Sequence, residues 1–487
     1  MNLQNLVDLV NSYVWSAPLV LLCLGTGIYF SIRTRFLQVR LIKDMVGQLW
    51  QGQASQSGVS SFQGFAMALG GRIGIGNIAG VATAIAMGGP GALFWMWMIA
   101  FLGAGSAYIE SALAQVWKEK IGGVYRGGPS YYIDKGLGQR WYSLLFAVVT
   151  VVSCGILLPG IQANSIAAAF HNAFPPVTPL YSGIFVTALL AMIIFGGVKR
   201  IGKAAELMVP FMALAYIAMA LVIIAVNIGK LPAVLSLVFS SALGLHSLFG
   251  GVVGSAIAWG VKRGIYSNEA GQGTGPQAAA AAEVAHPAQQ GLVQAFSVYV
   301  DTLFVCSATG FMLLMTGMYN TADGKGSFLA QNIPGIPEGP IWTQKAVDTL
   351  AGGFGGPFVA FALFLFAFTT LMAYAFYSES NVAYLFKKKP NAGIFLARIL
   401  LLAMTFFGSI RTANLAWGLG DIGVGVMAWL NIIAILLLSR VGLATLKDYE
   451  LQRKSGKPLT FNPEKLGIRN AGLWKQIAAE QKEAAGE

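Results

Sequence analysis

The segment that decides the fold of this chain is the run Gly70-Gly71-Arg72-Ile73-Gly74-Ile75-Gly76-Asn77. It lies inside an apolar stretch that extends from about Phe62 to Met87. Each glycine in a helix interior costs roughly 1 kcal/mol relative to alanine, so this run unwinds easily. In a bilayer, an unwound helix is tolerated only where its free amides and carbonyls face protein, water or a ligand. We therefore expect a helix break that binds something small and polar.

The composition is that of a polytopic helical membrane protein. Of the 487 residues, 56% are hydrophobic and only 11% are charged, and the mean hydropathy is +0.64. Soluble proteins carry about 25% charged residues. Many apolar runs approach the roughly 20 residues that a helix needs to cross a bilayer. The three cysteines, Cys23, Cys154 and Cys306, fall inside such runs, which argues against a disulfide framework.

Basic residues predict the topology. We expect eleven transmembrane helices, at approximately 13–32, 62–87, 92–116, 141–168, 180–197, 207–228, 247–265, 291–318, 357–384, 392–408 and 415–439. With the N-terminus outside, the inner segments, including residues 262–263, carry 27 lysines and arginines, and the outer segments carry four. This bias predicts an N-out/C-in orientation. The net charge of +12 is then a topology signal and not a sign of nucleic-acid binding.

Glycine-broken spans open both halves of the chain. The first is the Gly70–Asn77 run, and the second is Phe249-Gly250-Gly251-Val252-Val253-Gly254-Ser255. Paired broken helices that cross in opposite directions are typical of the binding sites of secondary transporters. We therefore divide the chain into an extra N-terminal helix with a basic linker (1–60), two five-helix inverted repeats (61–230 and 231–440) and a charged cytoplasmic tail (441–487).

Shorter segments are expected to be helical without crossing the membrane. They are Leu231–Phe239, Ile341–Leu350 and, in the tail, Trp474–Ala485. The histidines fall in or near loops, and we expect all of them, including His286, at the surface.

Four motifs occur in order along the chain: Arg72-Ile73-Gly74-Ile75-Gly76-Asn77-Ile78-Ala79-Gly80-Val81-Ala82, Gly127-Gly128-Pro129-Ser130-Tyr131-Tyr132, Gln162-Ala163-Asn164-Ser165 and Ser267-Asn268-Glu269-Ala270-Gly271-Gln272-Gly273. Together they resemble the signatures of the alanine or glycine:cation symporters, over about residues 15–450. The resemblance implies a LeuT-type fold with an extra N-terminal helix, and sodium-coupled import of alanine or glycine. Many members have Thr or Ser where this chain has Ile75, so we expect its selectivity to differ.

The unwound run is expected to bind an amino-acid carboxylate, because half-helix N-termini present unpaired N–H groups and a partial positive charge. The alternative for its glycines is close helix packing. The substrate contacts expected from this run are Gly74, Ile75, Gly76 and Asn77. Gln162 is supported by the resemblance, since an amide can bind either end of an amino acid. From the second broken helix we expect Gly251, Gly254 and Ser255.

Sodium is the expected coupling ion, and no cofactor is expected. A hard cation wants roughly six oxygens. By likeness to the common sodium site of the fold, the hydroxyls of Thr369 and Thr370 would face the unwound carbonyls of Gly70 and Ile73, and Asn77 would add a side-chain oxygen. The alternatives are that the threonines bond back to the preceding turn, and that Asn77 makes an interhelical hydrogen bond.

Four charges within spans are expected to be functional. Arg72 is too costly to face lipid, and we expect it to close an inner gate with Glu379 or Asp301. Asp301 lies near mid-depth, where it would alternatively join a second cation site. Glu110 and Glu379 lie toward inner span ends, where they would form pairs or line an exit.

The leading hypothesis is a multi-pass symporter of a bacterial inner membrane, whose partners are a small neutral amino acid, sodium and the bilayer, with no nucleic acid and no obligatory protein partner. The alternative is a proton-coupled or broader-specificity neutral amino-acid transporter. A channel would need polar faces on several helices. An intramembrane enzyme would need a Ser–His, Asp–Asp or H-E-x-x-H arrangement, and no histidine falls at mid-membrane depth.

Overall fold

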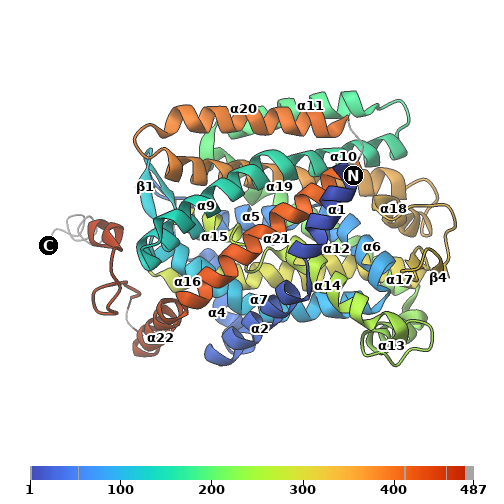
Figure 1. Ribbon diagram of the computed structural model, residues 1–487, viewed down its shortest axis with the longest axis horizontal. Helices are drawn as coiled ribbons and strands as arrows, with labels where there is room; N and C mark the ends of the chain where they lie inside the picture. Colours follow the sequence, from blue (N-terminus) through green and yellow to red (C-terminus); the bar gives the residue numbers. More distant parts are fainter. Residues whose placement is uncertain (1–2, 53, 411–412, 457, 478–487) are drawn as a thin grey trace.

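The computed structural model describes residues 3–52, 54–410, 413–456 and 458–477. Its described part is almost entirely helical, as Figure 1 shows. The helices are α1 (Leu3–Val14), α2 (Ala17–Arg33), α3 (Leu37–Arg40), α4 (Ile42–Gly47), α5 (Ser61–Arg72), α6 (Ala79–Gly88), α7 (Gly91–Val116), α8 (Pro129–Tyr132), α9 (Arg140–Val152), α10 (Leu158–Ala173), α11 (Pro179–Ile194), α12 (Gly197–Val226), α13 (Leu231–Ala242), α14 (Val253–Asn268), α15 (Gly275–Ala281), α16 (Pro287–Val298), α17 (Ser307–Thr316), α18 (Pro340–Asp348), α19 (Gly355–Leu385), α20 (Pro390–Ser409), α21 (Ala413–Leu437) and α22 (Ser439–Ser455). Two antiparallel hairpins join β1 (Glu119–Ile121) to β2 (Val124–Arg126) and β3 (Asn320–Ala322) to β4 (Phe328–Gln331).

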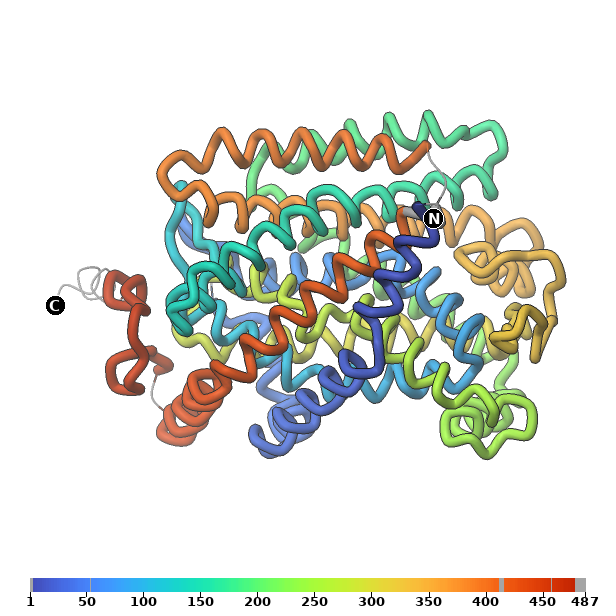
Figure 2. Tube along the Cα trace, in the orientation of Figure 1, coloured from blue at the N-terminus to red at the C-terminus, as the bar shows by residue number. Residues whose placement is uncertain are grey.

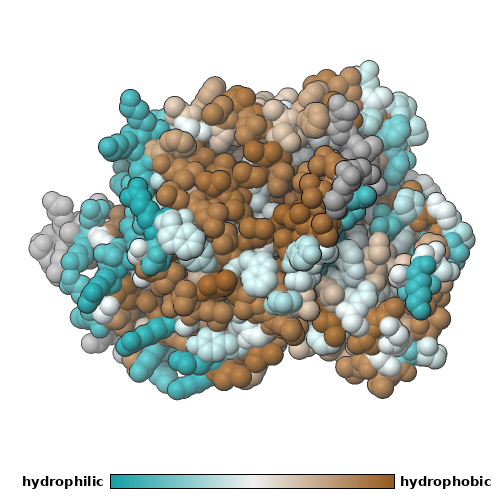
Figure 3. All heavy atoms as spheres, viewed as in Figure 1, coloured by the Kyte–Doolittle hydropathy of each residue, from teal (hydrophilic) through white to brown (hydrophobic). Residues whose placement is uncertain are grey.

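The helices form a bundle with an apolar middle. Eight helical segments among the described residues are long and apolar enough to cross a membrane, and three shorter apolar helices accompany them: Ala79–Gly88, Pro179–Ile194 and Ile228–Ala242. On the face seen in Figure 3, hydrophobic residues fill the centre, while hydrophilic residues gather toward the two ends. The chain is therefore a multi-pass membrane protein. The count of eleven spans and the N-out/C-in orientation stay predictions.

The first broken helix lies where the sequence places it. Helix α5 ends at Arg72, a single 3₁₀ turn follows at Ile75–Asn77, and α6 begins at Ala79. The N-terminus of α5 is fixed by a capping box between Ser60 and Gln63, which satisfies two end amides. Every residue from Gly70 to Ile78 is buried, so the break lies in the interior of the bundle.

The second break lies elsewhere than expected. Gly254 and Ser255 belong to the first turn of a continuous helix α14, and Gly251 belongs to a short turn before it. The expectation of a break at Phe249–Ser255 is therefore wrong. The chain instead unwinds at residues 269–274, between α14 and α15.

Backbone conformation explains where the second break falls. Glu269 ends α14 in the left-handed region, at a φ of 55°, and Gly271 and Gly273 have φ values of 84° and 88°. Glycine adopts such angles without the steric cost that other residues incur. Pro276 then starts α15, where its missing N–H and fixed φ are tolerated.

The observed position of the second break also changes where two basic residues lie. Lys262 and Arg263, counted above in an inner loop, lie inside α14 and are largely buried. Both pair with Asp421 of α21, with Lys262 Nζ at 2.7 Å from Oδ2 and Arg263 Nη1 at 3.0 Å from Oδ1. They therefore hold two helices together and do not report on topology.

The C-terminal segment lies at one end of the bundle, on the left in Figure 2. Trp474 is 3% exposed, and its Nε1 donates to the Gln115 carbonyl at 3.0 Å. Trp117 Nε1 donates to the Arg469 carbonyl at 2.9 Å. Residues 472–477 are helical, and the rest of the helix expected at Trp474–Ala485 lies outside the described residues. The tail is thus docked and not simply solvated.

His286 departs from its expected surface position. It is fully buried at the start of α16, where the Ala288 N–H donates to its Nδ1 at 3.1 Å. Its Nε2 lies 3.0 Å from Oδ2 of Asp448 on α22. A neutral ring with its proton on Nε2 satisfies both contacts. Burial lowers the pKa of His286, and Asp448 opposes that shift.

Trp474→Ala should release the docked tail, because emptying a buried aromatic site costs about 3–5 kcal/mol. Limited proteolysis of the purified chain should then cut residues 458–477 much faster than in the wild type. Lys475→Ala is the matched control, since Lys475 is exposed and forms an ion pair with the exposed Glu464. Equal cleavage rates in both variants would mean that Trp474 does not hold the tail.

Candidate functional site

The two breaks meet in the interior of the bundle. A Cβ placed on Gly76 would lie 3.2 Å from Tyr266 Cδ1 and 3.3 Å from Ser267 Cα. The backbone of the first break therefore packs directly against the end of α14. Glycine at this position permits the approach, because a larger side chain would push the two segments apart.

The free amides of the first break are held by two side-chain amides. The Gly74 N–H donates to Asn77 Oδ1 at 2.9 Å, and the Ile75 N–H donates to Gln162 Oε1 at 3.3 Å. Gln162 comes from α10, so the structure brings it to the break as the sequence predicts. Asn77 uses its oxygen to close the break, and its role as a direct sodium ligand stays a prediction.

The free carbonyls of the first break face one of the two candidate threonines. Thr370 Oγ1 lies 3.0 Å from the Gly70 oxygen and 3.3 Å from the Ile73 oxygen. Both threonines also contact the preceding turn: Thr370 Oγ1 lies 3.1 Å from the Phe366 carbonyl oxygen, and Thr369 Oγ1 donates to it at 2.9 Å. The three oxygens of Thr370, Gly70 and Ile73 form a cluster suited to a hard cation. The structure does not bring Thr369 into this cluster.

Asp301 joins the two breaks. It lies in a π-helical segment (Tyr299–Cys306) between α16 and α17, a feature that often marks functional sites. Its buried carboxylate accepts from Asn77 Nδ2 at 2.6 Å, from Ser267 Oγ at 2.9 Å and from Thr302 Oγ1 at 2.6 Å. All three donors are neutral, so the negative charge has no ion-pair partner within 4 Å among the described residues.

Arg72 does not contact either carboxylate expected for it. Its Nη1 donates to the Gln294 carbonyl at 3.2 Å and to Gln294 Oε1 at 3.1 Å, and it also contacts Ser297 Oγ. In the described part of the chain, its Nε and Nη2 have no hydrogen-bond partner. A Cβ on Gly275 would lie 2.6 Å from Nη2, so the guanidinium abuts the second break.

Glu379 and Glu110 have different partners from those expected. Glu379 pairs with Arg398 Nε at 2.7 Å and with Arg126 Nη2 at 3.7 Å, and so joins α19 to α20 and β2. Glu110 is buried, and it accepts from the Gly271 N–H at 3.2 Å and from Asn431 Nδ2 at 2.7 Å. Glu110 therefore holds the loop of the second break, and its role at an exit stays a prediction.

The second break adds polar groups that the sequence analysis did not single out. Glu269, Thr274 and Tyr377 are buried and close to one another, and no hydrogen bond of standard geometry reaches Glu269 Oε2, Thr274 Oγ1 or Tyr377 Oη among the described residues. The Tyr377 hydroxyl lies against Gly71, since a Cβ there would be 2.5 Å from it. The sequence signal for this break is the run that contains Gly271, Gly273, Gly275 and Pro276. Helix-breaking residues are more closely spaced there than in Phe249–Ser255.

The three residues expected from the second broken helix are not at the junction. Space is open around a Cβ on Gly251 or Gly254. Ser255 Oγ donates to the Met87 carbonyl at 2.7 Å, near the far end of α6. Ser255 therefore contributes to the end of the α6–α14 contact, whereas Gly251 and Gly254 border open space.

The junction therefore brings together buried backbone amides, neutral oxygens and the carboxylates of Asp301 and Glu269. Such groups can bind the carboxylate and ammonium of a small zwitterion, and they can bind a monovalent cation. The junction is therefore the candidate functional site.

Comparison with known proteins gives a consistent result. Residues 1–463 match the sodium:alanine symporter family. The chain is 56% identical over 475 residues to the putative sodium/proton-dependent alanine carrier protein YrbD of Bacillus subtilis (strain 168), covering 97% of this chain and 98% of that protein. It is 44% identical over 470 residues to the probable sodium/glutamine symporter GlnT of the same organism, with 96% and 95% covered.

A solved structure shows the fold. The crystal structure of MhsT in complex with L-phenylalanine aligns with a TM-score of 0.53 at 12% identity, and the match covers 81% of this chain and 99% of that one. The likeness supports the LeuT-type fold expected from the sequence.

Gly74→Ala should damage the junction, because the new Cβ would lie 2.6 Å from Thr370 Oγ1 and 3.2 Å from Gln162 Oε1. We expect a loss of about 1–3 kcal/mol, seen as a lower unfolding temperature of the purified protein. Gly80→Ala is the control on the same broken helix, since its Cβ would meet only Arg263 Cδ at 3.8 Å. If both variants unfold at the same temperature, the packing around Gly74 is looser than the structure indicates.

Proposed function

This chain belongs to the sodium:alanine symporter family, and we propose that it imports alanine together with sodium, with glycine as a second substrate. Its named relatives are carriers and symporters, so the protein is a transporter and not an enzyme. The observation that carries the proposal is the buried junction at which Gly74–Asn77, Gln162 and Asp301 meet.

The substrate carboxylate would bind to the amides of the first break. In this structure the Gly74 and Ile75 N–H groups donate to the side-chain oxygens of Asn77 and Gln162. A substrate carboxylate could take the place of these oxygens as the acceptor. Gln162 would then turn to contact the substrate directly. The ammonium group would face the buried oxygens of the second break, among them Glu269 Oε2. This assignment replaces Gly251, Gly254 and Ser255, which the structure does not bring to the junction.

Sodium would bind at the oxygens of Thr370, Gly70 and Ile73, because these atoms converge where the helix is unwound. Asp301 supports a second cation position, since it is a buried carboxylate held only by neutral donors. A carboxylate can take up either sodium or a proton. Asp301 therefore also supports the alternative of proton coupling, which the name of YrbD includes for that relative.

Transport would proceed by alternating access between the two sides of the membrane. In the N-out/C-in arrangement of eleven spans, which holds the two five-helix repeats (61–230 and 231–440), one bundle of helices would rock to switch access to the junction. Arg72 is suited to a gating role, because its free Nε and Nη2 abut the second break and can gain or lose partners as that break moves. A channel would need a continuous polar path, whereas residues 70–78 are buried throughout.

Uptake of labelled alanine into proteoliposomes tests the function. An inward sodium gradient should drive accumulation above equilibrium, and abolishing all ion gradients should reduce it to equilibration. Accumulation driven by a proton gradient alone would refute sodium coupling, and equal accumulation with no gradient would refute symport.

Thr370→Val should raise the sodium concentration for half-maximal uptake by roughly tenfold, because it removes one oxygen ligand while keeping the side-chain volume. Thr369→Val is the matched control one residue away, and it should leave the sodium dependence unchanged. Equal sodium dependence in Thr370→Val and the wild type would remove Thr370 from the ion site.

Ile75→Thr should change the preference among amino acids, because it introduces a hydroxyl into the unwound run. Competition of unlabelled glycine, serine and glutamine against labelled alanine measures the effect. We expect a shift of several-fold toward polar competitors, since a buried hydroxyl gains by pairing with a polar ligand. An unchanged competition profile would mean that the Ile75 side chain faces away from the substrate.

A further inference from the structure

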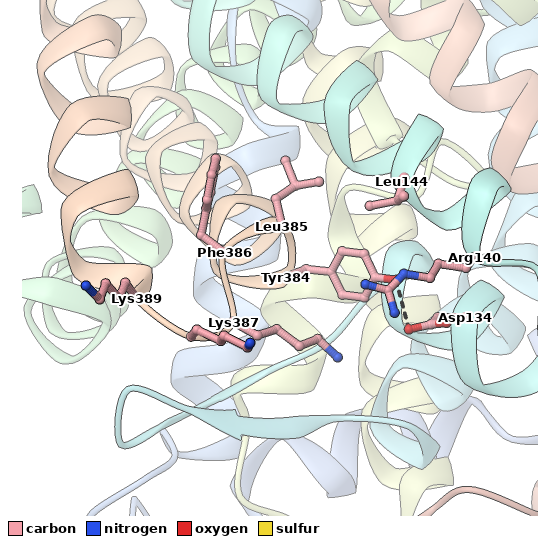
Figure 4. A pocket seen from close by; sticks show the side chains of 9 residues that line it. Asp134, Arg140, Leu144, Tyr384, Leu385, Phe386, Lys387 and Lys389 are labelled. Carbon is pink, nitrogen blue, oxygen red and sulfur yellow. Dashed lines mark hydrogen bonds between the residues drawn. The ribbon is translucent and has the colours of Figure 1, made fainter.

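A pocket of about 620 Å³ opens where three membrane-length helices begin or end (Figure 4). Helix α9 begins at Arg140, α19 ends at Leu385, and α20 begins at Pro390. The ends of apolar spans mark the boundary between hydrocarbon and water. The pocket therefore lies at the depth of the lipid headgroups, and none of the residues that line it belongs to the junction of the two breaks.

One part of the pocket lining is strongly basic. It contains Arg140, Lys387, Lys388 and Lys389, and all four side chains are exposed. In Figure 4, Arg140 lies on one side of Tyr384 and the lysines lie on the other.

Little negative charge offsets these residues. Lys387 Nζ pairs with Glu119 at 3.0 Å. Asp134, the acidic residue of the lining, accepts a hydrogen bond from Tyr384 Oη at 2.8 Å. Within the described ranges, no carboxylate oxygen lies within 4 Å of the charged nitrogens of Arg140, Lys388 or Lys389. The pocket thus presents a net positive charge to whatever enters it.

The other part of the lining is apolar. Leu144, Leu385 and Phe386 line the pocket, and Phe386 is 56% exposed. Trp141, next to Arg140, is 67% exposed. Tryptophan is enriched at the membrane interface because its ring is amphipathic. A ligand that fills the pocket would therefore have an anionic head and an apolar tail.

We propose that this pocket binds an anionic phospholipid, with the phosphate headgroup on Arg140, Lys388 and Lys389 and the acyl chains along Leu144 and Phe386. Basic pockets between transmembrane helices are suited to such headgroups. A free phosphate ion would use only the charged half of the lining, so the apolar half favours the lipid.

The bound lipid would join two helices that serve the junction. Helix α9 continues through a π-helical turn (Ser153–Leu157) into α10, which carries Gln162, and α19 carries Thr370. A headgroup between Arg140 and Lys388 would tie the ends of these two helices together. The proposal does not depend on which amino acid or ion is transported.

Native mass spectrometry of the full-length purified chain, titrated with phosphatidylglycerol and with phosphatidylcholine of the same acyl chains, tests the proposal. We expect clear selectivity for phosphatidylglycerol. Lys388→Gln/Lys389→Gln should weaken its binding roughly 30-fold, because each basic residue near anionic lipid contributes about fivefold. Arg140→Gln, on the other wall, should weaken it about fivefold.

The control removes the same charge at another helix end. Lys199→Gln/Lys203→Gln changes two exposed lysines at the start of α12, which do not line the pocket. It should leave the retained phosphatidylglycerol unchanged. An equal loss in both double variants would overturn the proposal in favour of diffuse attraction. Complete displacement of the lipid by inorganic phosphate would also overturn it, since the site would then be one for a free anion.

Discussion

The structure depends on one constraint: backbone amides and carbonyls freed inside a membrane must find partners, because each one left unpaired costs several kcal/mol. The first break satisfies this constraint with side chains from distant parts of the chain. Asn77 and Gln162 accept from its amides, and Thr370 contacts its carbonyls. Glu110 does the same for the amide of Gly271 in the second break. A substrate or ion can replace these partners without leaving backbone amides or carbonyls unpaired. A helix break can therefore serve as a binding site.

Several buried charges differ in their surroundings. Away from the junction, two buried acids form ion pairs: Asp421 with Lys262 and Arg263, and Glu379 with Arg398. At the junction, Arg72 and Asp301 have only neutral partners. Removing one partner of a buried pair is strongly destabilising, so the outer pairs fix the helices that they join. The charged groups at the junction can exchange their neutral hydrogen-bond partners for a ligand at a lower free-energy cost than breaking a buried ion pair.

Much of the fold and part of the candidate site could be predicted from the sequence, and each wrong prediction has a physical cause. The break at Gly70–Asn77 was predictable because its glycines, arginine and asparagine interrupt an apolar run locally. The second break was misplaced because Gly250–Gly254 are as rich in glycine as a true break, yet α14 packs continuously from Val253. The choice between Thr369 and Thr370 depends on helix rotation, which tertiary packing sets. The partners of Arg72 and Glu379 come from α16 and α20, and no local pattern encodes such distant contacts.

The central claim is that substrate and ion bind where the two breaks meet. A structure determined with alanine, and with thallium(I) in place of sodium, measures this directly. The account predicts alanine density between Gly74–Asn77 and Ser267–Gly271, with a cation beside the oxygens of Thr370 and Gly70. Alanine density beside Gly251 and Ser255, with none at the junction, would contradict it.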